Sequence, residues 1–188
     1  NHLNEYLKLF EEGKDKKIRG ESSTTYLFFY EKCIANIKRI HPNPSELKIV
    51  ITLRNPVERA FSQYMHKLRD GAESLSFEEA LTQEQWRKEN NWHFDYQYVQ
   101  RGFYYNQVKA YLDNFPSVKI YLSEDLRRGL VSSLEDFLQI DRIPLDFGDE
   151  LNVSGEPKIE SVNKFLKRKN PLKSFFGKLL PKEIRRKA

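Results

Sequence analysis

Cysteine is nearly absent from this chain of 188 residues, which contains only Cys33. A single thiol excludes an internal disulfide framework and a cysteine-based zinc site, and it is typical of proteins in a reducing compartment. We therefore expect a cytoplasmic protein. The four histidines do not have the spacing of a helical or loop metal pair, since they are His2, His41, His66 and His93. The sequence therefore predicts no metal site.

Long apolar runs are also missing, and no stretch approaches the roughly 18 consecutive apolar residues of a transmembrane helix. The start of the chain lacks the charged region, apolar core and cleavage site of a signal peptide. No two of the eight glycines lie closer than seven residues apart, which excludes the GxGxxG and Walker phosphate loops from these residues. With 13% aromatic and 31% charged residues, the composition predicts a folded globular domain.

Charge is distributed unevenly along the chain. Residues 164–188 contain ten lysines or arginines and one acid, Glu183, whereas residues 1–163 have a net charge of −4. We therefore expect a folded domain over residues 1–163 and a basic C-terminal tail over residues 164–188. The tail could bind a membrane surface or a polyanion, but we favour its docking on the acidic remainder of the chain. We expect no nucleic-acid partner, because composition alone supplies no basic face on the folded body.

Two short apolar runs, residues 48–53 and 118–122, are typical of buried strands. Helical spacing is predicted over residues 3–10, 26–39, 104–115 and 130–138, and in a helix that Pro56 can open. The last of these has one apolar stripe, formed by Val57, Ala60, Phe61, Tyr64 and Leu68. This alternation predicts an α/β fold with a parallel sheet flanked by helices.

A capping box and an aromatic loop are predicted between the main helices. Ser76 and Glu79 have the spacing of the box, for a helix that runs to about residue 89. Residues 90–101 form a surface loop that is rich in aromatic side chains, namely Trp92, His93, Phe94, Tyr96 and Tyr98. These rings could recognise an apolar or sugar acceptor, or they could pack the loop onto the body, and both interpretations stay open.

Arg54 follows the first predicted strand and comes just before a helix. Ligands in an open parallel sheet collect beyond the carboxyl ends of the strands, and a helix N-terminus there favours an anion. The arginine fork offers two donors to a phosphate, and Ser62, less than two turns into the helix, can add a hydroxyl. The alternative is that Arg54 pairs with Glu58 and that Ser62 is an ordinary surface residue.

Residues 54–64, with the sequence RNPVERAFSQY, resemble the 3′-phosphate-binding segment of sulfotransferases that use 3′-phosphoadenosine 5′-phosphosulfate (PAPS). The resemblance is to the branch of bacterial and heparan-type enzymes. Three further segments resemble the same family in the same order: GESSTTYL at 20–27, RGFY at 101–104 and NVSGEPK at 152–158. Together the four segments span most of residues 3–170.

This resemblance implies a P-loop, nucleotide-kinase-like fold and transfer of a sulfuryl group from PAPS, without a metal, to a hydroxyl or amine. The product nucleotide is 3′-phosphoadenosine 5′-phosphate (PAP). The resemblance also implies that Arg54 and Ser62 hold the 3′-phosphate, and that Gly155 and Lys158 lie in a late loop that closes on the nucleotide. Tyr104 is a further candidate nucleotide contact, although an aromatic residue there could equally pack in the core.

The chain also departs from the family's pattern. The family's first strand, its loop around the phosphosulfate and its usual catalytic base would all lie before Asn1. We therefore expect residues 1–188 to be inactive on their own. Heparan-type enzymes tend to carry lysine where this chain has Ser22, so the polysaccharide contact there is in doubt. Ser23 and Thr24 could line the acceptor cleft or cap the following helix.

Several alternatives stay open. His66 lies one turn after Ser62 and could touch the acceptor, or it could be a solvated surface residue. The acceptor could be a small molecule, a carbohydrate or a lipid-like compound. A kinase-related phosphoryl transferase is a second candidate function, although the chain contains neither a Walker loop nor an obvious paired-acid magnesium site. A non-catalytic module that binds polyanions or membranes through the basic tail is a third.

Overall fold

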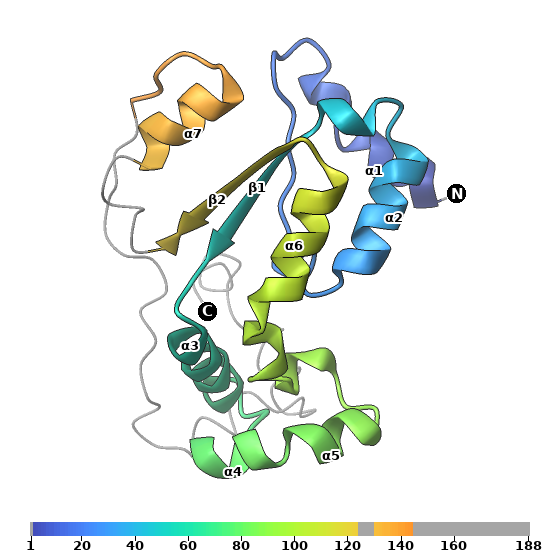
Figure 1. Cartoon of the computed structure of the whole chain (residues 1–188). Helices are drawn as coiled ribbons and strands as arrows, with labels where there is room; N and C mark the ends of the chain where they lie inside the picture. The colour runs from blue at the N-terminus through green and yellow to red at the C-terminus, as the bar shows by residue number, and fades with distance from the viewer. Residues whose placement is uncertain (1, 124–129, 145–188) are drawn as a thin grey trace, which may run out of the picture. The chain divides into compact units, whose positions relative to one another are not determined.

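In a computed structural model of the protein, which describes residues 2–123 and 130–144, helices alternate with two strands (Figure 1). The strands are β1 (Lys48–Leu53) and β2 (Ser117–Leu122). The α-helices are α1 (His2–Lys8), α2 (Tyr30–Ile40), α3 (Pro56–Arg69), α4 (Phe77–Thr82), α5 (Glu84–Glu89), α6 (Tyr104–Asn114) and α7 (Leu130–Leu138). Single 3-10 turns lie at Glu11–Gly13, Pro44–Glu46, Phe94–Tyr96 and Gln100–Gly102. The described residues divide into unit 1, residues 2–56, 103–123 and 130–144, and unit 2, residues 57–102.

The two strands of unit 1 pair in parallel. Their register runs from Lys48 opposite Ser117 to Leu53 opposite Leu122. Parallel strands need a long crossover between them, and here the crossover contains all the described residues of unit 2. The predicted positions of both strands and their parallel direction are confirmed.

One face of this sheet is covered by α2 and α6 (Figure 1). Ile51 of β1 packs in a core with Ile34 of α2 and with Tyr111 and Phe115 from α6 and its C-terminal end. The two helices are also linked at their C-terminal ends, where Lys38 Nζ donates to Asn114 Oδ1 at 2.6 Å. The helical stripes of α2 and α6 therefore form the main core of unit 1.

The opposite face of the sheet contacts α7. Lys48 Nζ donates to the carbonyl of Phe137 at 2.8 Å, and Tyr121 Oη donates to Ser133 Oγ at 3.2 Å. Lys48 and Tyr121 point away from the α2 side because successive side chains alternate along a strand. Helices thus contact both faces, which confirms the predicted α/β arrangement in this unit.

The second helix begins later than predicted, at Tyr30 instead of residue 26. Residues 24–29 form turns, and tertiary contacts hold them there. Tyr111 Oη donates to the carbonyl of Tyr26 at 3.0 Å, and Tyr26 Oη donates to Glu21 Oε1 at 2.7 Å. The contact with Tyr111, which is far from Tyr26 in sequence, thus helps to override the local helical pattern.

Unit 2 is built on α3. Its core contains Ala60, Tyr64 and Met65 of α3, packed against Ala80 of α4 and the fully buried Tyr98. The predicted apolar stripe is therefore correct at Ala60 and Tyr64. It is wrong at Val57 and Phe61, which are exposed, because the buried face of α3 turns toward Met65.

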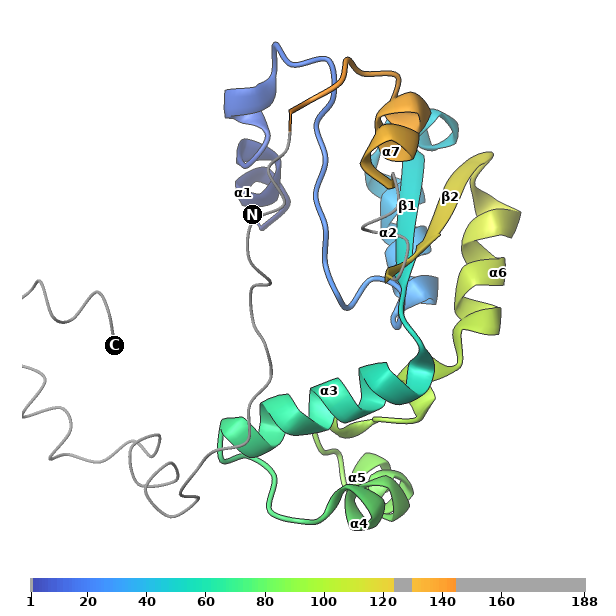
Figure 2. The ribbon, with the colours of Figure 1, turned by 90° about the vertical axis from the view of Figure 1, so that its left-hand side faces the viewer.

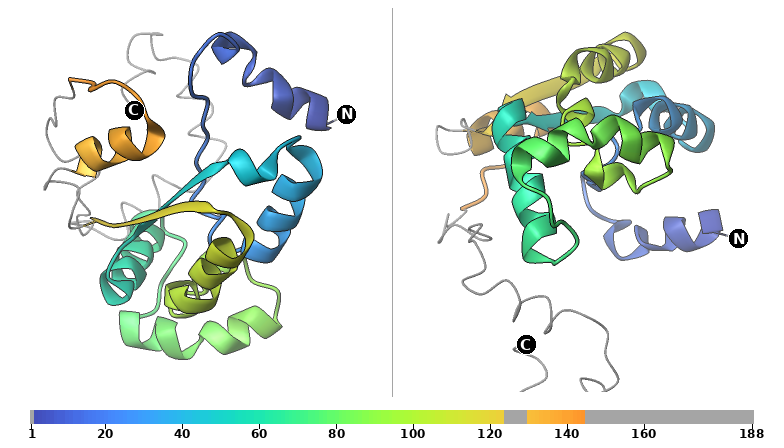
Figure 3. Two further views of the ribbon diagram at one scale, coloured as in Figure 1. Left: turned by 45° about the horizontal axis from the view of Figure 1, so that its top comes forward. Right: turned by 90° about the horizontal axis from the view of Figure 1, so that it is seen from below.

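The predicted capping box is present at the start of α4. Ser76 Oγ accepts from the backbone N–H of Glu79, whose carboxylate accepts from the N–H of Ser76 at 2.9 Å. The predicted long helix is interrupted at Gln83, so α4 and α5 follow one another as two short helices (Figure 3). After this break, the Glu84 carboxylate accepts from the N–H groups of Val99 and Gln100 and fixes the loop that follows.

A buried ion pair lies in unit 2. Arg87 and Glu73 are 4% and 3% exposed, and the guanidinium donates to both carboxylate oxygens, at 2.6 and 3.0 Å. Tyr98 Oη donates to the same carboxylate at 3.0 Å. Burial raises the pKa of Glu73, but the hydrogen bonds from Arg87 and from the N–H groups of Leu75 and Ser74 outweigh it, so the net pKa is lowered.

Candidate functional site

The predicted nucleotide-site residues of unit 1 lie at the carboxyl end of its sheet. Both α2 and α6 begin at the end of unit 1 where β1 and β2 finish (Figures 1 and 2). This is the end at which open parallel sheets bind ligands, and the N-terminal ends of helices are favourable for anions. The starts of α2 and α6 and the residue after β1 therefore lie at the same end of unit 1.

Arg54 is the first residue after β1, and it is exposed. Asn55 separates it from Pro56, which opens α3 as predicted. Ser62 lies within α3 and is half-buried. Arg54 belongs to unit 1 and Ser62 to unit 2. Arg54 therefore has the predicted position, directly after a strand and just before a helix.

Ser23 directly precedes the turns that lead into α2, Thr24 is the first residue of those turns, and both are exposed. Ser23 Oγ accepts from the N–H of Thr25 at 3.3 Å and lies 2.8 Å from Thr25 Oγ1. Such a bond closes a local serine turn. The N-cap of α2 is instead Phe29, which makes no side-chain cap. The helix-capping alternative is therefore wrong, and the prediction that these two hydroxyl groups line an acceptor cleft stays a prediction.

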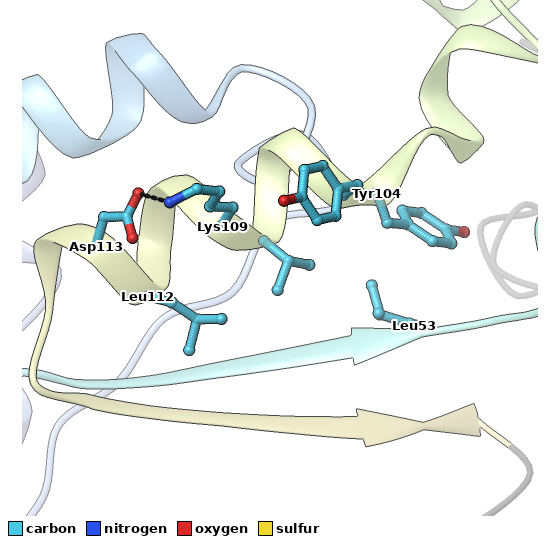
Figure 4. A pocket seen from close by; sticks show the side chains of 7 residues that line it. Leu53, Tyr104, Lys109, Leu112 and Asp113 are labelled. Carbon is cyan, nitrogen blue, oxygen red and sulfur yellow. Dashed lines mark hydrogen bonds and ion pairs between the residues drawn. The ribbon is translucent and has the colours of Figure 1, made fainter.

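Tyr104 lies at the first position of α6 and forms part of a pocket in unit 1 (Figure 4). The pocket has a volume of about 460 Å³ and is lined mainly by apolar groups, from Leu53, Tyr104, Tyr105, Val108, Lys109, Leu112 and Asp113. Lys109 and Asp113 form an exposed ion pair at 2.6 Å, one turn apart on α6. Leu53 is the last residue of β1, so the pocket borders the strand end that Arg54 follows.

His66 lies on α3 one turn after Ser62 and is half-buried. Arg69 Nη2 lies 2.6 Å from His66 Nδ1. A guanidinium group can only donate, so Nδ1 is the acceptor, and the neutral imidazole then carries its proton on Nε2. In this arrangement Nε2–H can act as a hydrogen-bond donor.

Two predicted nucleotide contacts, Gly155 and Lys158, lie outside the described residues, as does the basic tail. Within residues 2–123 and 130–144, no group of three or more metal-ligating side chains is close enough to hold an ion. In the same ranges, no helix is long and apolar enough to cross a membrane.

Two polar features near α6 and α2 were not predicted from the sequence. Glu21 accepts from Tyr26, and this hydrogen bond together with burial raises the pKa of Tyr26 to about 12. Burial and a side-chain hydrogen bond with Glu21 also raise the pKa of Tyr6. Gln107 of α6 is 5% exposed, and its Oε1 has no hydrogen-bond partner within the part of the chain that the structure describes. The only sequence signal for the burial of Gln107 was its position among apolar residues of α6.

The chain is similar in sequence and in structure to one protein of known structure. A sulfotransferase from Alicyclobacillus acidocaldarius, known from its crystal structure, matches with 37% sequence identity and a TM-score of 0.62. This chain is therefore similar to a bacterial sulfotransferase. The match covers 79% of this chain and 61% of the sulfotransferase chain, so this chain corresponds to part of that enzyme's length.

No protein-family model and no curated protein matches the chain. The similarity to the sulfotransferase agrees with the family that the segments at 20–27, 54–64, 101–104 and 152–158 resemble. It is consistent with an α/β sulfotransferase fold for the parallel strands and their helices.

Proposed function

We propose that this protein transfers a sulfuryl group from PAPS to a hydroxyl or amine of an acceptor. The observation that carries the proposal is the position of Arg54, directly after a parallel strand and before a helix, in a chain 37% identical to a sulfotransferase over most of its length. An arginine there can form two charge-assisted hydrogen bonds with a phosphate. In the proposal, Arg54 and Ser62 bind the 3′-phosphate, and Gly155 and Lys158 contribute from the later loop.

In this proposal, the pocket next to Leu53 holds the planar base of the nucleotide, because it has apolar walls and includes the ring of Tyr104. Arg54 is the residue directly after Leu53 in the chain. Bound PAPS would supply a sulfuryl group already joined to a good leaving group. The acceptor oxygen or nitrogen forms a bond to sulfur, the bond from sulfur to the phosphate oxygen breaks, and PAP leaves with that electron pair.

The described residues contribute alignment and hydrogen bonds to this reaction. Ser23 and Thr24 have exposed hydroxyl groups in the segment before α2, and we propose that they line the acceptor side. His66 can add an Nε2–H donor to the acceptor. The proton of the acceptor goes to a base that we do not assign among the described residues.

The test of this function is calorimetry with two nucleotides of similar charge, PAP and ADP. We expect PAP to bind more tightly, because only PAP has the 3′-phosphate that Arg54 and Ser62 would contact. Equal affinities would remove the main support for a PAPS-dependent reaction. Tighter binding of ADP would favour the kinase-related alternative.

A further inference from the structure

Both tryptophans of the chain, Trp86 and Trp92, lie next to each other on the surface of unit 2. Their side chains are 51% and 42% exposed, and their ring centroids lie 6.2 Å apart with the planes at 63°. We call these two residues the indole pair. Tryptophan is highly buried on average, so two adjacent, half-exposed indoles are an uncommon feature of a protein surface.

The C-terminal end of α5 brings the two rings together. Asn91 adopts a left-handed conformation with φ of 57°, which turns the chain back over the helix. The N–H of Trp92 then donates to the carbonyl of Arg87 at 2.9 Å, and the N–H of Asn91 donates to that of Lys88 at 3.2 Å. These are the two bonds of a Schellman motif, which closes the C-terminal end of a helix by bonding the residues after it to the carbonyls of the last helical turn. The backbone thus fixes where Trp92 lies.

Arg87 of the buried ion pair packs against the Trp92 ring and helps to fix its position. The guanidinium of Arg87 lies 5.0 Å from the centroid of Trp92 and 5.1 Å from that of Tyr96. Tyr96 also contacts Trp92 edge to face, with centroids 5.0 Å apart. Since Glu73 holds Arg87 with two hydrogen bonds, the ring is supported by groups that are themselves fixed. A ligand that stacks on it would have little side-chain motion to arrest.

The surroundings of the indole pair favour a neutral, hydroxyl-rich ligand. The exposed side-chain amides of Gln83 and Asn90 lie one helical turn before and after Trp86. Asn90 Nδ2 donates to the carbonyl of Trp86 at 2.9 Å, so Oδ1 is the atom of this amide that can accept from a ligand. The charge of Arg87 is compensated by Glu73, and the exposed Lys88 and Glu89 carry opposite charges. The exposed area of two half-exposed rings is far smaller than the roughly 1,000 Å² that a stable protein interface buries, so a small ligand fits this surface better than a protein partner. A sugar ring combines an apolar C–H face, which packs on an indole face, with hydroxyl groups that bond to amides.

We propose that the indole pair is a binding platform for a neutral saccharide. The apolar face of a pyranose ring stacks on the exposed indole surface, and its hydroxyl groups hydrogen-bond with the neighbouring amides.

Intrinsic fluorescence gives a direct test, because both tryptophans of the chain belong to the platform. We would titrate the full chain with tri-N-acetylchitotriose and, separately, with glycerol, which has hydroxyl groups but no ring face. A saturable change in tryptophan emission with the trisaccharide is expected. A linear response equal to that of glycerol would overturn the proposal.

Variants show whether the indole itself is responsible. Trp86→Ala should weaken trisaccharide binding roughly three- to tenfold, read from the emission of Trp92, and Trp86→Phe should recover part of the loss. Phe29→Ala removes a half-exposed ring from unit 1 and should leave the affinity unchanged. An unchanged affinity in both Trp86 variants, or self-association of the protein that these variants abolish, would contradict a saccharide site.

This test is separate from the test of the donor. Saccharide binding with equal affinities for PAP and ADP would remove the sulfotransferase proposal and leave the platform. A clear preference for PAP without any saccharide response would do the reverse.

Discussion

Arg54 is the residue on which the proposed donor site depends most. Replacing it by alanine removes a charge-assisted hydrogen bond to the 3′-phosphate, so PAP binding should weaken by roughly 1.5–3 kcal/mol. ADP, which lacks that phosphate, should be affected much less. Isothermal calorimetry with both nucleotides measures the difference.

The matched control for Arg54→Ala is Arg39→Ala. Arg39 lies in the last turn of α2, at the opposite end of unit 1 from the carboxyl end of the sheet, so its removal should change neither affinity. If Arg54→Ala binds PAP as tightly as the unaltered protein, Arg54 is a structural residue, as the alternative pairing with Glu58 would require.

Gln107 has an unusual environment for an amide. Its side chain is buried, and its Oε1 has no hydrogen-bond partner within the described ranges. A buried polar group without a partner costs free energy. Gln107→Met keeps the length of the side chain and removes that cost, so we expect the free energy of unfolding to rise by on the order of 1 kcal/mol, measured by urea denaturation.

Asn114 on the same helix provides the control for Gln107→Met. Its side chain accepts from Lys38 at 2.6 Å and donates to the carbonyl of Ala110 at 2.7 Å. Asn114→Leu should therefore lower the free energy of unfolding, opposite in sign to Gln107→Met. A loss of stability in Gln107→Met would mean that its carboxamide makes hydrogen bonds in solution, for example to water.

At the scale of elements, the ion pair that links α5 to the segment before α4 should make unit 2 sensitive to acid. Because the folded protein lowers the pKa of Glu73 below its ordinary value of 4.5, the stabilisation is fully present above that value. It is lost as the pH falls through the folded pKa. At neutral pH, Glu73→Gln should cost about 3–5 kcal/mol, because Arg87 is left as a buried, uncompensated charge.

Unfolding curves at neutral pH and below pH 4.5 would measure this effect. The difference in the free energy of unfolding between Glu73→Gln and the unaltered protein should become smaller in acid. Glu78→Gln, at an exposed position on α4, should change stability little at either pH. A Glu73→Gln difference that stays constant with pH would contradict a role for the ionised carboxylate.

Local sequence signals were sufficient for most elements. Both strands, α6, α7 and the capping box at Ser76 followed from periodicity and from well-known turn chemistry. The start of α2 did not, because its first turns are held by hydrogen bonds from Tyr111 and to Glu21. The same limit applies to the pairing of Glu73 with Arg87, because Glu73 lies in the segment before α4 and Arg87 in α5, and no local spacing predicts their contact.

The candidate site was predictable to a similar degree. The position of Arg54 after a strand and of Tyr104 at a helix start follow from the order of elements. The pocket beside Leu53 and the indole pair depend on how side chains from several turns meet. For the aromatic loop, the alternative that its rings pack onto the body is correct for Tyr98, which is buried. Trp92 is half-exposed.

At the scale of the whole molecule, the charge of the tail makes a prediction about membranes. Ten basic residues near an anionic bilayer would each contribute on the order of 1 kcal/mol. We expect the tail to associate instead with the acidic remainder of the chain, so little protein should sediment with phosphatidylserine vesicles. Strong, salt-sensitive sedimentation that disappears when the chain is truncated after Asn163 would contradict this expectation.

The long crossover between β1 and β2 has a consequence for how the chain folds. Each residue of β1 pairs with a partner 69 positions later, so the sheet cannot form until a long loop has closed, at a cost in chain entropy. If unit 2 folds first, the two ends of that loop become tethered by an ordered segment instead of a random coil. Unit 2 would then act as a folding template for strand pairing, and mutations that loosen its core would slow the formation of the sheet in unit 1.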